Sequence, residues 1–466
     1  MALWRTRAPV AHWTDSPLAR LLGPMHAFIQ HSAASGILLM AATIAALVLA
    51  NSPLAAAYDA VLHVELGLIL GPFTLTETVQ HWINDGLMAV FFFLVGLEIK
   101  REVTVGELAN PRAAALPILA AVGGVVVPAL IYTVFNANGT GAAGWGVPMA
   151  TDIAFALGVL ALLRDRVPFT IKVFLTAVAI VDDLLAVLVI ALFYAGDLNL
   201  AALGMGVGVL VVLLLANRLG IRTLVVYVLL GIVVWLAFLQ SGVHATIAGV
   251  LVALTIPARN RIDAPTFIRR AERLLHHLDA QEVGPSPMLT DEAQQSAVIE
   301  LEELCEQVQA PLQKLEHTLH PWVQFGIMPI FALANAGVAV SLGALTGTAS
   351  PVVLGIVLGL VLGKPIGVLG MSWLAVRVGL VTLPPHVTWR HMIGVSVLAG
   401  IGFTMSLFIA SLAFADADVL ATAKVAILVA SLLAGTAGLL LLRRLPQPAP
   451  ADAPPQVLPA AQGGGQ

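Results

Sequence analysis

The sequence predicts an all-α polytopic membrane protein. Of its 466 residues, 59% are hydrophobic and only 11% are charged, with a mean hydropathy of +0.94, whereas soluble domains carry about a quarter charged residues. Apolar stretches of about 20 residues, long enough to cross a ~30 Å hydrocarbon layer, recur along nearly the whole chain. They lack the alternation of a transmembrane β-barrel, which has segments of about 10 residues. The composition therefore excludes a soluble globule and favours membrane-spanning helices.

We expect about twelve spanning helices, separated by polar loops. Their predicted ranges are 34–51, 82–99, 113–135, 143–163, 170–195, 201–217, 223–240, 243–257, 321–343, 351–376, 390–414 and 420–442. Lys and Arg concentrate in short cytoplasmic loops of membrane proteins. Sorted by loop, they all fall on one face here, except Lys424 on the other face and Lys364 within a span. Both termini are therefore expected in the cytoplasm, and the number of helices is expected to be even.

Two loops have a character of their own. Residues 63–79 place β-favouring side chains on both sides of Gly71 and Pro72, which predicts a small outward-facing β-hairpin, with an irregular loop as the alternative. The segment 259–316 is a long insertion between the eighth and ninth spans. Its second part predicts a cytoplasmic helix packed on the body or on a partner, because apolar residues repeat at helical spacing opposite an acidic face. These residues are Leu301, Leu304, Val308, Leu312 and Leu315.

The chain therefore divides into a membrane domain, residues 34–443, and two cytoplasmic ends. Residues 1–33 form a basic N-terminal segment, and the first apolar run is expected to be a retained helix rather than a signal peptide. The tail 444–466 is rich in Pro, Ala, Gln and Gly, so we expect it to be disordered. Cys305 is the single cysteine, which excludes an intramolecular disulfide.

Four ionisable residues lie in the middle of predicted spans. They are Asp152 in the fourth span, Asp182 and Asp183 in the fifth, and Lys364 in the tenth. A charge in hydrocarbon costs at least ~2.5–3.5 kcal/mol, so such residues usually mark ion or proton pathways. The alternative for each is a buried salt bridge that only fixes helix packing. One lysine cannot neutralise both adjacent aspartates, although Lys364 itself could serve simply as a counter-charge.

The balance of these four charges suggests a mechanism. Three carboxylates and one ammonium leave an excess of two negative charges, which a low-dielectric interior does not tolerate unpaired. One Na⁺ or two protons would offset it. Both bind carboxylate oxygens, and a metal cation binds only the deprotonated form. Competition of this kind predicts exchange of Na⁺ for H⁺.

Helix-breaking residues point to the same depth. Pro148 can interrupt the fourth span, and Gly400 and Gly402 can interrupt the eleventh. Residues 113–195 and 351–442 would form two inverted three-helix repeats, each broken in its middle helix, because they start on opposite sides of the membrane. Two broken, crossing helices at matching positions of inverted repeats indicate a transporter's binding site. Glycines also serve ordinary close packing in membranes, so the pair alone is weak evidence.

Eight segments together resemble NhaA-type sodium/proton antiporters of bacterial inner membranes. They are WINDGLMAVFFFLVGLE (82–98), ATDIAFALG (150–158), VDD (181–183), SGVHAT (241–246), LHPW (319–322), FALANAG (331–337), GKP (363–365) and GIGFTMS (400–406). The resemblance runs from about residue 25 to 443, and the insertion after Arg259 is its main departure. It implies a secondary active antiporter, not an enzyme, with Na⁺, Li⁺ and H⁺ as transported ions and no cofactor.

The resemblance also implies roles for individual residues. The cation and proton site would consist of Asp183 with Asp182, Asp152 and Thr151, and Lys364 would pair with Asp182. Exchange would be electrogenic, about two protons for one Na⁺ or Li⁺.

A pH-sensing cluster at the cytoplasmic mouth is implied as well. It would comprise Glu98, Arg101, Glu102, Glu316, His317 and His320. The alternative is a solvated charged face; the residues themselves show only that charges gather where histidine can titrate near physiological pH. His244 is expected to be structural or a pH modulator.

The expected partners are small cations, the lipid bilayer and a second copy of the chain, joined through the hairpin; no nucleic acid is expected. Two other functions remain open from the residues alone. An intramembrane aspartyl protease also needs two membrane aspartates, but its Gly-x-Gly-Asp signature is absent. A passive cation channel could line a pore with carboxylates, but it would need no competition between Na⁺ and H⁺.

Overall fold

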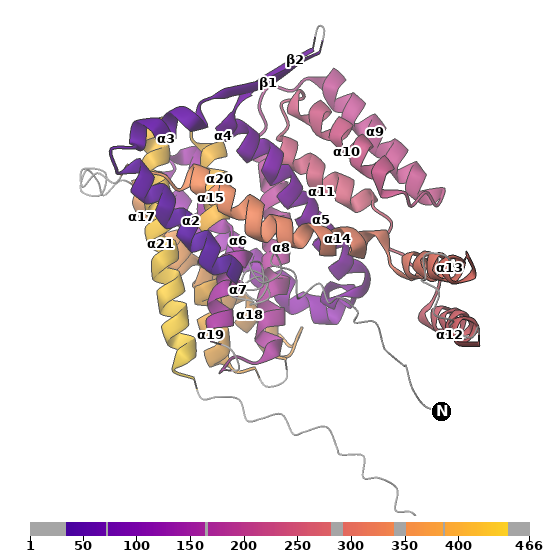
Figure 1. Ribbon diagram of the computed structural model, residues 1–466. Coiled ribbons are helices and arrows are strands. Elements are labelled where there is room, and N and C mark those ends of the chain that lie inside the picture. The colour runs from indigo at the N-terminus through magenta and orange to yellow at the C-terminus, as the bar shows by residue number, and fades with distance from the viewer. Residues whose placement is uncertain are drawn as a thin grey trace, which may run out of the picture.

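The residues that the structure describes fold into a bundle of helices with one pair of β-strands (Figure 1). The computed structural model describes residues 34–70, 73–163, 166–280, 292–339, 351–384 and 387–445. The predicted ends 1–33 and 446–466, the turn at residues 71–72 and residues 340–343 of the ninth span lie outside this part. Within it, seven helices are long and apolar enough to cross a membrane, or nine if each of two bent helix pairs is one span. The prediction of a polytopic, mainly helical membrane protein is confirmed.

The first two helices of the described part meet at a sharp angle. Helix α2 (Ala34–Ala50) leads into α3 (Ala55–Leu62) through a 114° bend. Strands β1 (Glu65–Leu70) and β2 (Phe73–Thr78) then pair antiparallel, with Glu65 opposite Thr78 and Leu70 opposite Phe73. The predicted pairing of two β-strands in this loop is therefore confirmed.

The next four helical segments carry most of the charged residues discussed above. The second predicted span consists of α4 (Val79–His81), the π-helix η2 (Trp82–Leu87) and α5 (Met88–Val105). A 3₁₀ turn, η3 (Glu107–Ala109), leads to α6 (Pro111–Asn136). The 3₁₀ helix η4 (Ala142–Met149) and α7 (Ile153–Leu162) correspond to the fourth predicted span, and α8 (Phe169–Phe193) corresponds to the fifth.

A peripheral group of helices and the insertion follow. Helices α9 (Leu200–Arg218), α10 (Leu224–Leu239) and α11 (Ala245–Thr255) lie at one side of the bundle (Figure 1). The insertion contributes α12 (Ala264–Ala280) and α13 (Glu292–Val308). Next come α14 (Pro311–Trp322), the π-helix η6 (Val323–Ile327) and α15 (Met328–Asn335).

The C-terminal part contains three further spans. Helix α17 (Pro351–Leu358), the π-helix η7 (Gly359–Gly363) and α18 (Lys364–Arg377) follow one another without a break. Helices α19 (Trp389–Leu398) and α20 (Phe403–Ala413) are bent by 45° at their junction. The long helix α21 (Ala417–Arg443) ends the bundle.

Two predictions about the insertion and the ninth span were wrong. The apolar stripe from Leu301 to Leu315 does not lie on one helix, because α13 ends at Val308 and a new helix starts at Pro311. Proline has no N–H to continue a helix but fits its first turn. The ninth helical segment therefore begins at Pro311, ten residues before the predicted start, and ends at Asn335. Helix α12 was not predicted.

Helices α6 and α18 approach closely through glycine. A Cβ placed on Gly367 would lie 2.0 Å from the carbonyl oxygen of Gly123, whereas one on Gly370 of the same helix would meet no atom within 4 Å. This contact matters for the site because α18 starts with Lys364.

We expect Gly367→Ala to destabilise the protein and Gly370→Ala to leave it unchanged or slightly more stable. Alanine favours a helix over glycine by about 0.5–1 kcal/mol, but forcing a methyl against a backbone carbonyl typically costs about 1–3 kcal/mol. Melting temperatures of the two purified variants in one detergent give the comparison. Equal melting temperatures would contradict the close packing of α6 and α18.

Candidate cation-binding site

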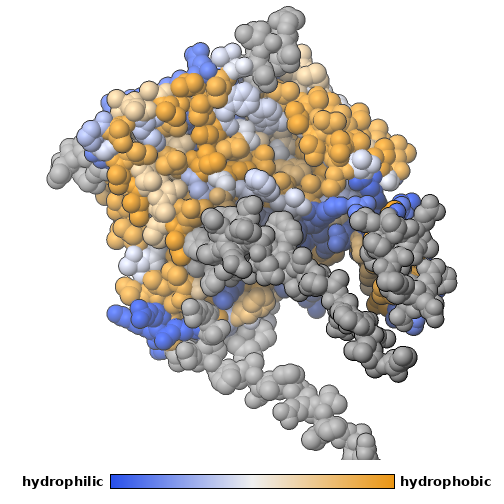
Figure 2. Space-filling model, viewed as in Figure 1, coloured by the Kyte–Doolittle hydropathy of each residue, from blue (hydrophilic) through white to orange (hydrophobic). Residues whose placement is uncertain are grey.

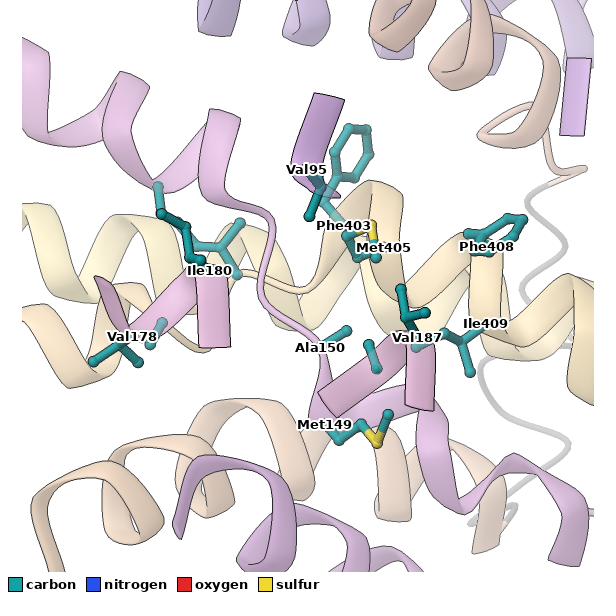
Figure 3. Close-up of a cluster of buried hydrophobic side chains, with 14 of the residues drawn as sticks. Val95, Met149, Ala150, Val178, Ile180, Val187, Phe403, Met405, Phe408 and Ile409 are labelled. Carbon is teal, nitrogen blue, oxygen red and sulfur yellow. The ribbon is translucent and has the colours of Figure 1, made fainter. Parts of the chain in front are cut away.

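Two interrupted helical segments lie against each other inside the bundle. Residues 150–152 form an extended link between η4 and α7, and residues 399–402 link α19 to α20. The N–H of Asp152 donates to the carbonyl oxygen of Ile401 over 2.7 Å. Figure 3 shows the two links side by side near Ala150, among packed apolar side chains. The links free backbone groups that continuous helices would bond internally.

Small residues let a third segment pack onto these links. A Cβ on Gly400 would lie 2.4 Å from the carbonyl oxygen of Leu360, and one on Gly402 would lie 2.9 Å from a methyl group of Leu360. Gly359 in turn packs against Pro148, because a Cβ on Gly359 would lie 2.7 Å from the Cβ of Pro148. The π-helix η7, which contains Gly359 and Leu360 and leads directly to Lys364, therefore touches the link 399–402 and the end of η4, just before the link 150–152.

Asp152 caps the first turn of α7 and reaches across to α20. Its Oδ1 accepts from the N–H of Phe155 at 2.9 Å, and its Oδ2 accepts from the N–H of Thr404 at 3.1 Å and from the Thr404 hydroxyl. The negative carboxylate thus offsets the positive ends of two helices that begin at Ile153 and Phe403. Both carboxylate oxygens of Asp152 therefore accept hydrogen bonds from the protein itself.

Asp182 binds Lys364 and Thr151 through one oxygen. The ammonium of Lys364 donates to Asp182 Oδ2, and the Thr151 hydroxyl lies 2.6 Å from the same atom. The hydroxyl also lies 2.8 Å from the carbonyl oxygen of Ala399. One hydroxyl hydrogen is thus shared between two acceptors.

One oxygen of each residue in the aspartate pair has no such partner. Both Asp182 Oδ1 and Asp183 Oδ1 are buried and accept no hydrogen bond. Exposure is only 1% for Asp182, 2% for Asp183 and 0% for Lys364. Leaving charged acceptors buried without donors is costly. Carboxylate oxygens are the ligands that hard cations prefer, so these two atoms fit a small cation or protons.

A cavity leads toward this site from one end of the bundle. It has a volume of about 1110 Å³, and its lining includes Glu98, Arg101, Glu316 and His320 at one end. Its lining also includes Ile153 and Ala154, next to Asp152 in the chain, and Ile180, two residues before Asp182. The cavity therefore joins the region of the aspartates to the charged end of α5 and α14.

The charged end is organised around one arginine. Arg101 donates to Glu102 at 2.7 Å and also to Glu316, which joins α5 to α14. Burial raises the pKa of Glu316, although Arg101 opposes this. Burial lowers the pKa of His320, and His317 and Arg101 act in the same direction. On acidification, Glu316 takes up its proton at a higher pH than an ordinary glutamate, and His320 at a lower pH than an ordinary histidine.

Two histidines of the predicted pH-sensing set, His317 and His244, do not line this cavity. His317 is exposed and does not line the cavity. His244 lies before α11, with its Nε2 2.6 Å from the carbonyl oxygen of Tyr194, just after the end of α8. The cavity touches α8 near its start, at Lys172 and Thr176. A helix of 25 residues is about 37 Å long, so the structure does not bring His244 to the cluster.

Comparison of the amino-acid sequence with known proteins shows the family of this chain. The family model described as Na⁺/H⁺ antiporter 1 matches residues 26–442. The chain belongs to this family. It is 51% identical over 430 residues to the Na⁺/H⁺ antiporter NhaA 2 of Syntrophotalea carbinolica, covering 92% of this chain and 98% of that protein. It is 52% identical over 430 residues to NhaA of Oleidesulfovibrio alaskensis, covering 92% and 95%, and 49% identical over 428 residues to NhaA of Koribacter versatilis, covering 92% and 93%.

Family membership confirms the resemblance drawn from the eight motifs. The relatives are named as antiporters, which are transporters, so the prediction that the chain is not an enzyme is confirmed.

The sequence-based assignment missed one side chain that follows the link 399–402, Thr404, whose hydroxyl and N–H both bind Asp152. The sequence contained a signal for this residue, because Thr404 is a hydroxyl residue in an apolar run, directly after Gly402-Phe403.

Proposed function

We propose that this chain is a secondary active antiporter that exports Na⁺ or Li⁺ in exchange for about two incoming protons. The observation that carries the proposal is the pair of free, buried oxygens on Asp182 and Asp183 beside a single buried ammonium. One cation or two protons would relieve the excess negative charge, and both would occupy the same oxygens. Asp183 would be the principal ligand, and Asp182 would be the lysine-linked proton carrier.

The links 150–152 and 399–402 support alternating access at this site. The environments of Asp152 and Asp182 depend on short, non-helical backbone held by a few hydrogen bonds, which can rearrange more readily than continuous helices. We propose twelve membrane crossings with inverted repeats at 113–195 and 351–442. We also propose location in the bacterial inner membrane, both termini in the cytoplasm, an outward hairpin and a homodimer.

The competition between Na⁺ and protons gives the first test. For the native protein we expect the apparent affinity for Na⁺ to fall as the pH falls, by up to about tenfold per pH unit for each competing proton. A pH-sensitive dye in inverted vesicles reports the proton movement that added Na⁺ drives. An apparent affinity independent of pH would favour separate sites for the two ions.

The same assay separates the rival functions. A passive cation channel would admit Na⁺ without Na⁺-dependent proton movement against a gradient. An aspartyl protease would move neither ion. Exchange of two protons for one Na⁺ moves one net charge, so a membrane potential should change its rate.

We propose further that the cluster of Arg101, Glu102, Glu316 and His320, with Glu98 and His317, sets the pH range of activity. Acidification neutralises Glu316 and charges His320, so it removes one partner of Arg101 and adds positive charge beside it. Four of these residues, Glu98, Arg101, Glu316 and His320, line the cavity that leads toward the aspartates. Its charge state can therefore influence both the entry of cations and the position of α14 against α5.

Glu316→Gln should move the midpoint of the pH–activity profile to higher pH, by about half a unit or more. Glutamine permanently represents the protonated carboxyl, so the variant starts one step toward the acid form. Glu306→Gln is the matched control, because Glu306 forms an exposed ion pair with Lys314, 2.8 Å away. Identical profiles for native protein and Glu316→Gln would contradict a regulatory role for this residue.

A further inference from the structure

The insertion forms a helical hairpin that the transport site does not use. Its two ends are joined by the N–H of Arg261, which donates to the carbonyl oxygen of Gln307 over 2.9 Å. The Asn217 side chain donates to the carbonyl oxygen of Thr255 at 2.7 Å, and Arg222 donates to that of Asn260 at 3.4 Å. The hairpin of α12 and α13 therefore leaves the bundle at the ends of α9 and α10, and Figure 1 shows both helices beside the bundle.

Helices α9 and α10 form an apolar outer wall of the bundle. Their exposed side chains include Val211, Leu215, Val225 and Leu229, each about half or more exposed. Figure 2 shows this region as a continuous hydrophobic surface. A surface of this kind faces lipid in a membrane protein. The hairpin therefore starts where the lipid-facing wall ends, at the level expected for lipid headgroups.

Helix α12 has one apolar edge directed away from α13. Ile268 and Leu275 are each 53% exposed and lie on the same helix face, because they are seven residues apart. They are absent from the lining of the polar cavity of about 560 Å³ between the two helices, to which α12 contributes Arg270, Arg273 and His276. Arg269 lies next to the apolar edge.

The charges of the two helices differ in sign. Helix α12 contains three arginines and two acidic residues, whereas α13 contains five glutamates and no basic residue. An anionic surface would attract α12 and repel α13. A basic amphipathic helix beside a lipid-facing wall has the pattern of helices that lie in the headgroup layer.

We propose that α12 docks on anionic phospholipid headgroups beside α9 and α10. Ile268 and Leu275 enter the boundary of the acyl chains, and Arg269 binds the headgroups. Glu272 lies between the two apolar residues on the same face, so it opposes docking. The docked hairpin would hold the start of α14, because Leu312 donates to the carbonyl oxygen of Pro257 at the base of the hairpin (3.2 Å).

The test uses a fluorescent label on α12 of the full chain. In a Cys305→Ser background, which has no other cysteine, Leu275→Cys is labelled with a polarity-sensitive dye in vesicles of phosphatidylcholine with or without phosphatidylglycerol. We expect a blue shift only with phosphatidylglycerol, reversed by high salt. Arg269→Gln should lower the ratio of docked to free helix about fivefold, and Glu272→Gln should raise it. Arg273→Gln should change the ratio less, because Arg273 lines the cavity between α12 and α13.

A label at Glu302→Cys on the exposed acidic face of α13 is the matched control and should not shift. An equal shift at Leu275 in both vesicle types would overturn recognition of anionic lipid, and so would no shift in either. A shift that depends on protein density rather than on lipid would instead assign the surface to a second copy of the chain. The fluorescence does not depend on ion exchange, so the result stands whether or not the proposed transport activity is found.

Discussion

Asp183→Asn is expected to abolish Na⁺-driven proton movement, lowering the apparent affinity for Na⁺ by about two orders of magnitude or more. The substitution keeps the size of the side chain but removes the charge that offsets a desolvated cation, a loss worth several kcal/mol. Asp183 Oδ1 is buried and has no hydrogen-bond donor. Dye-reported exchange in inverted vesicles measures the activity, and calorimetric titration of Na⁺ into the purified protein measures binding.

Asp182→Asn should also abolish exchange, because it removes the partner of Lys364 and one of the two free oxygens. Asp418→Asn is the control for a general effect of losing an acidic residue, since Asp418 is exposed in the first turn of α21. Full exchange in either site variant, at the protein level of the native chain, would remove the aspartate pair from the mechanism.

Lys364→Met is expected to destabilise the protein by about 3–5 kcal/mol, because removal of one partner leaves the other buried charge uncompensated. Lys364 is fully buried, and Asp182 is the partner of its ion pair. The double variant Asp182→Asn with Lys364→Met should be more stable than Lys364→Met alone, because neither charge then remains. Melting temperatures of both single variants and the double variant form the thermodynamic cycle.

Lys314→Met provides the comparison for an exposed pair. Lys314 and Glu306 are 49% and 62% exposed at their side chains, and exposed pairs contribute about 0–1 kcal/mol. Additive effects of Asp182→Asn and Lys364→Met would show that the two charges are not energetically coupled.

Much of this protein could be predicted from the residue pattern because hydrocarbon permits few solutions. Twenty-residue apolar runs can only be helices, and charges within them must be functional or paired. Hence Asp152, Asp182, Asp183 and Lys364 stand out by residue type and position alone, as do the interruptions at Pro148 and Gly400. The motifs also indicated the family correctly.

The insertion was predicted less well because it lies in water, where pattern constrains less. An apolar stripe can continue across two helices, and Pro311 divides this one. Helix α12 was missed because its apolar and basic residues alternate without a long hydrophobic run.

The sequence by itself determined the class of protein, the family and the four charges within apolar runs, since each follows from residue type and spacing along one chain. Only the tertiary structure decided which oxygens are free. It assigned Asp152 to Thr404 and the N-terminal turn of α7, Asp182 Oδ2 to Lys364 and Thr151, and left Asp182 Oδ1 and Asp183 Oδ1 without donors. These partners come from segments up to 252 residues apart, and local pattern carries no information on which distant backbone groups fold against a given carboxylate.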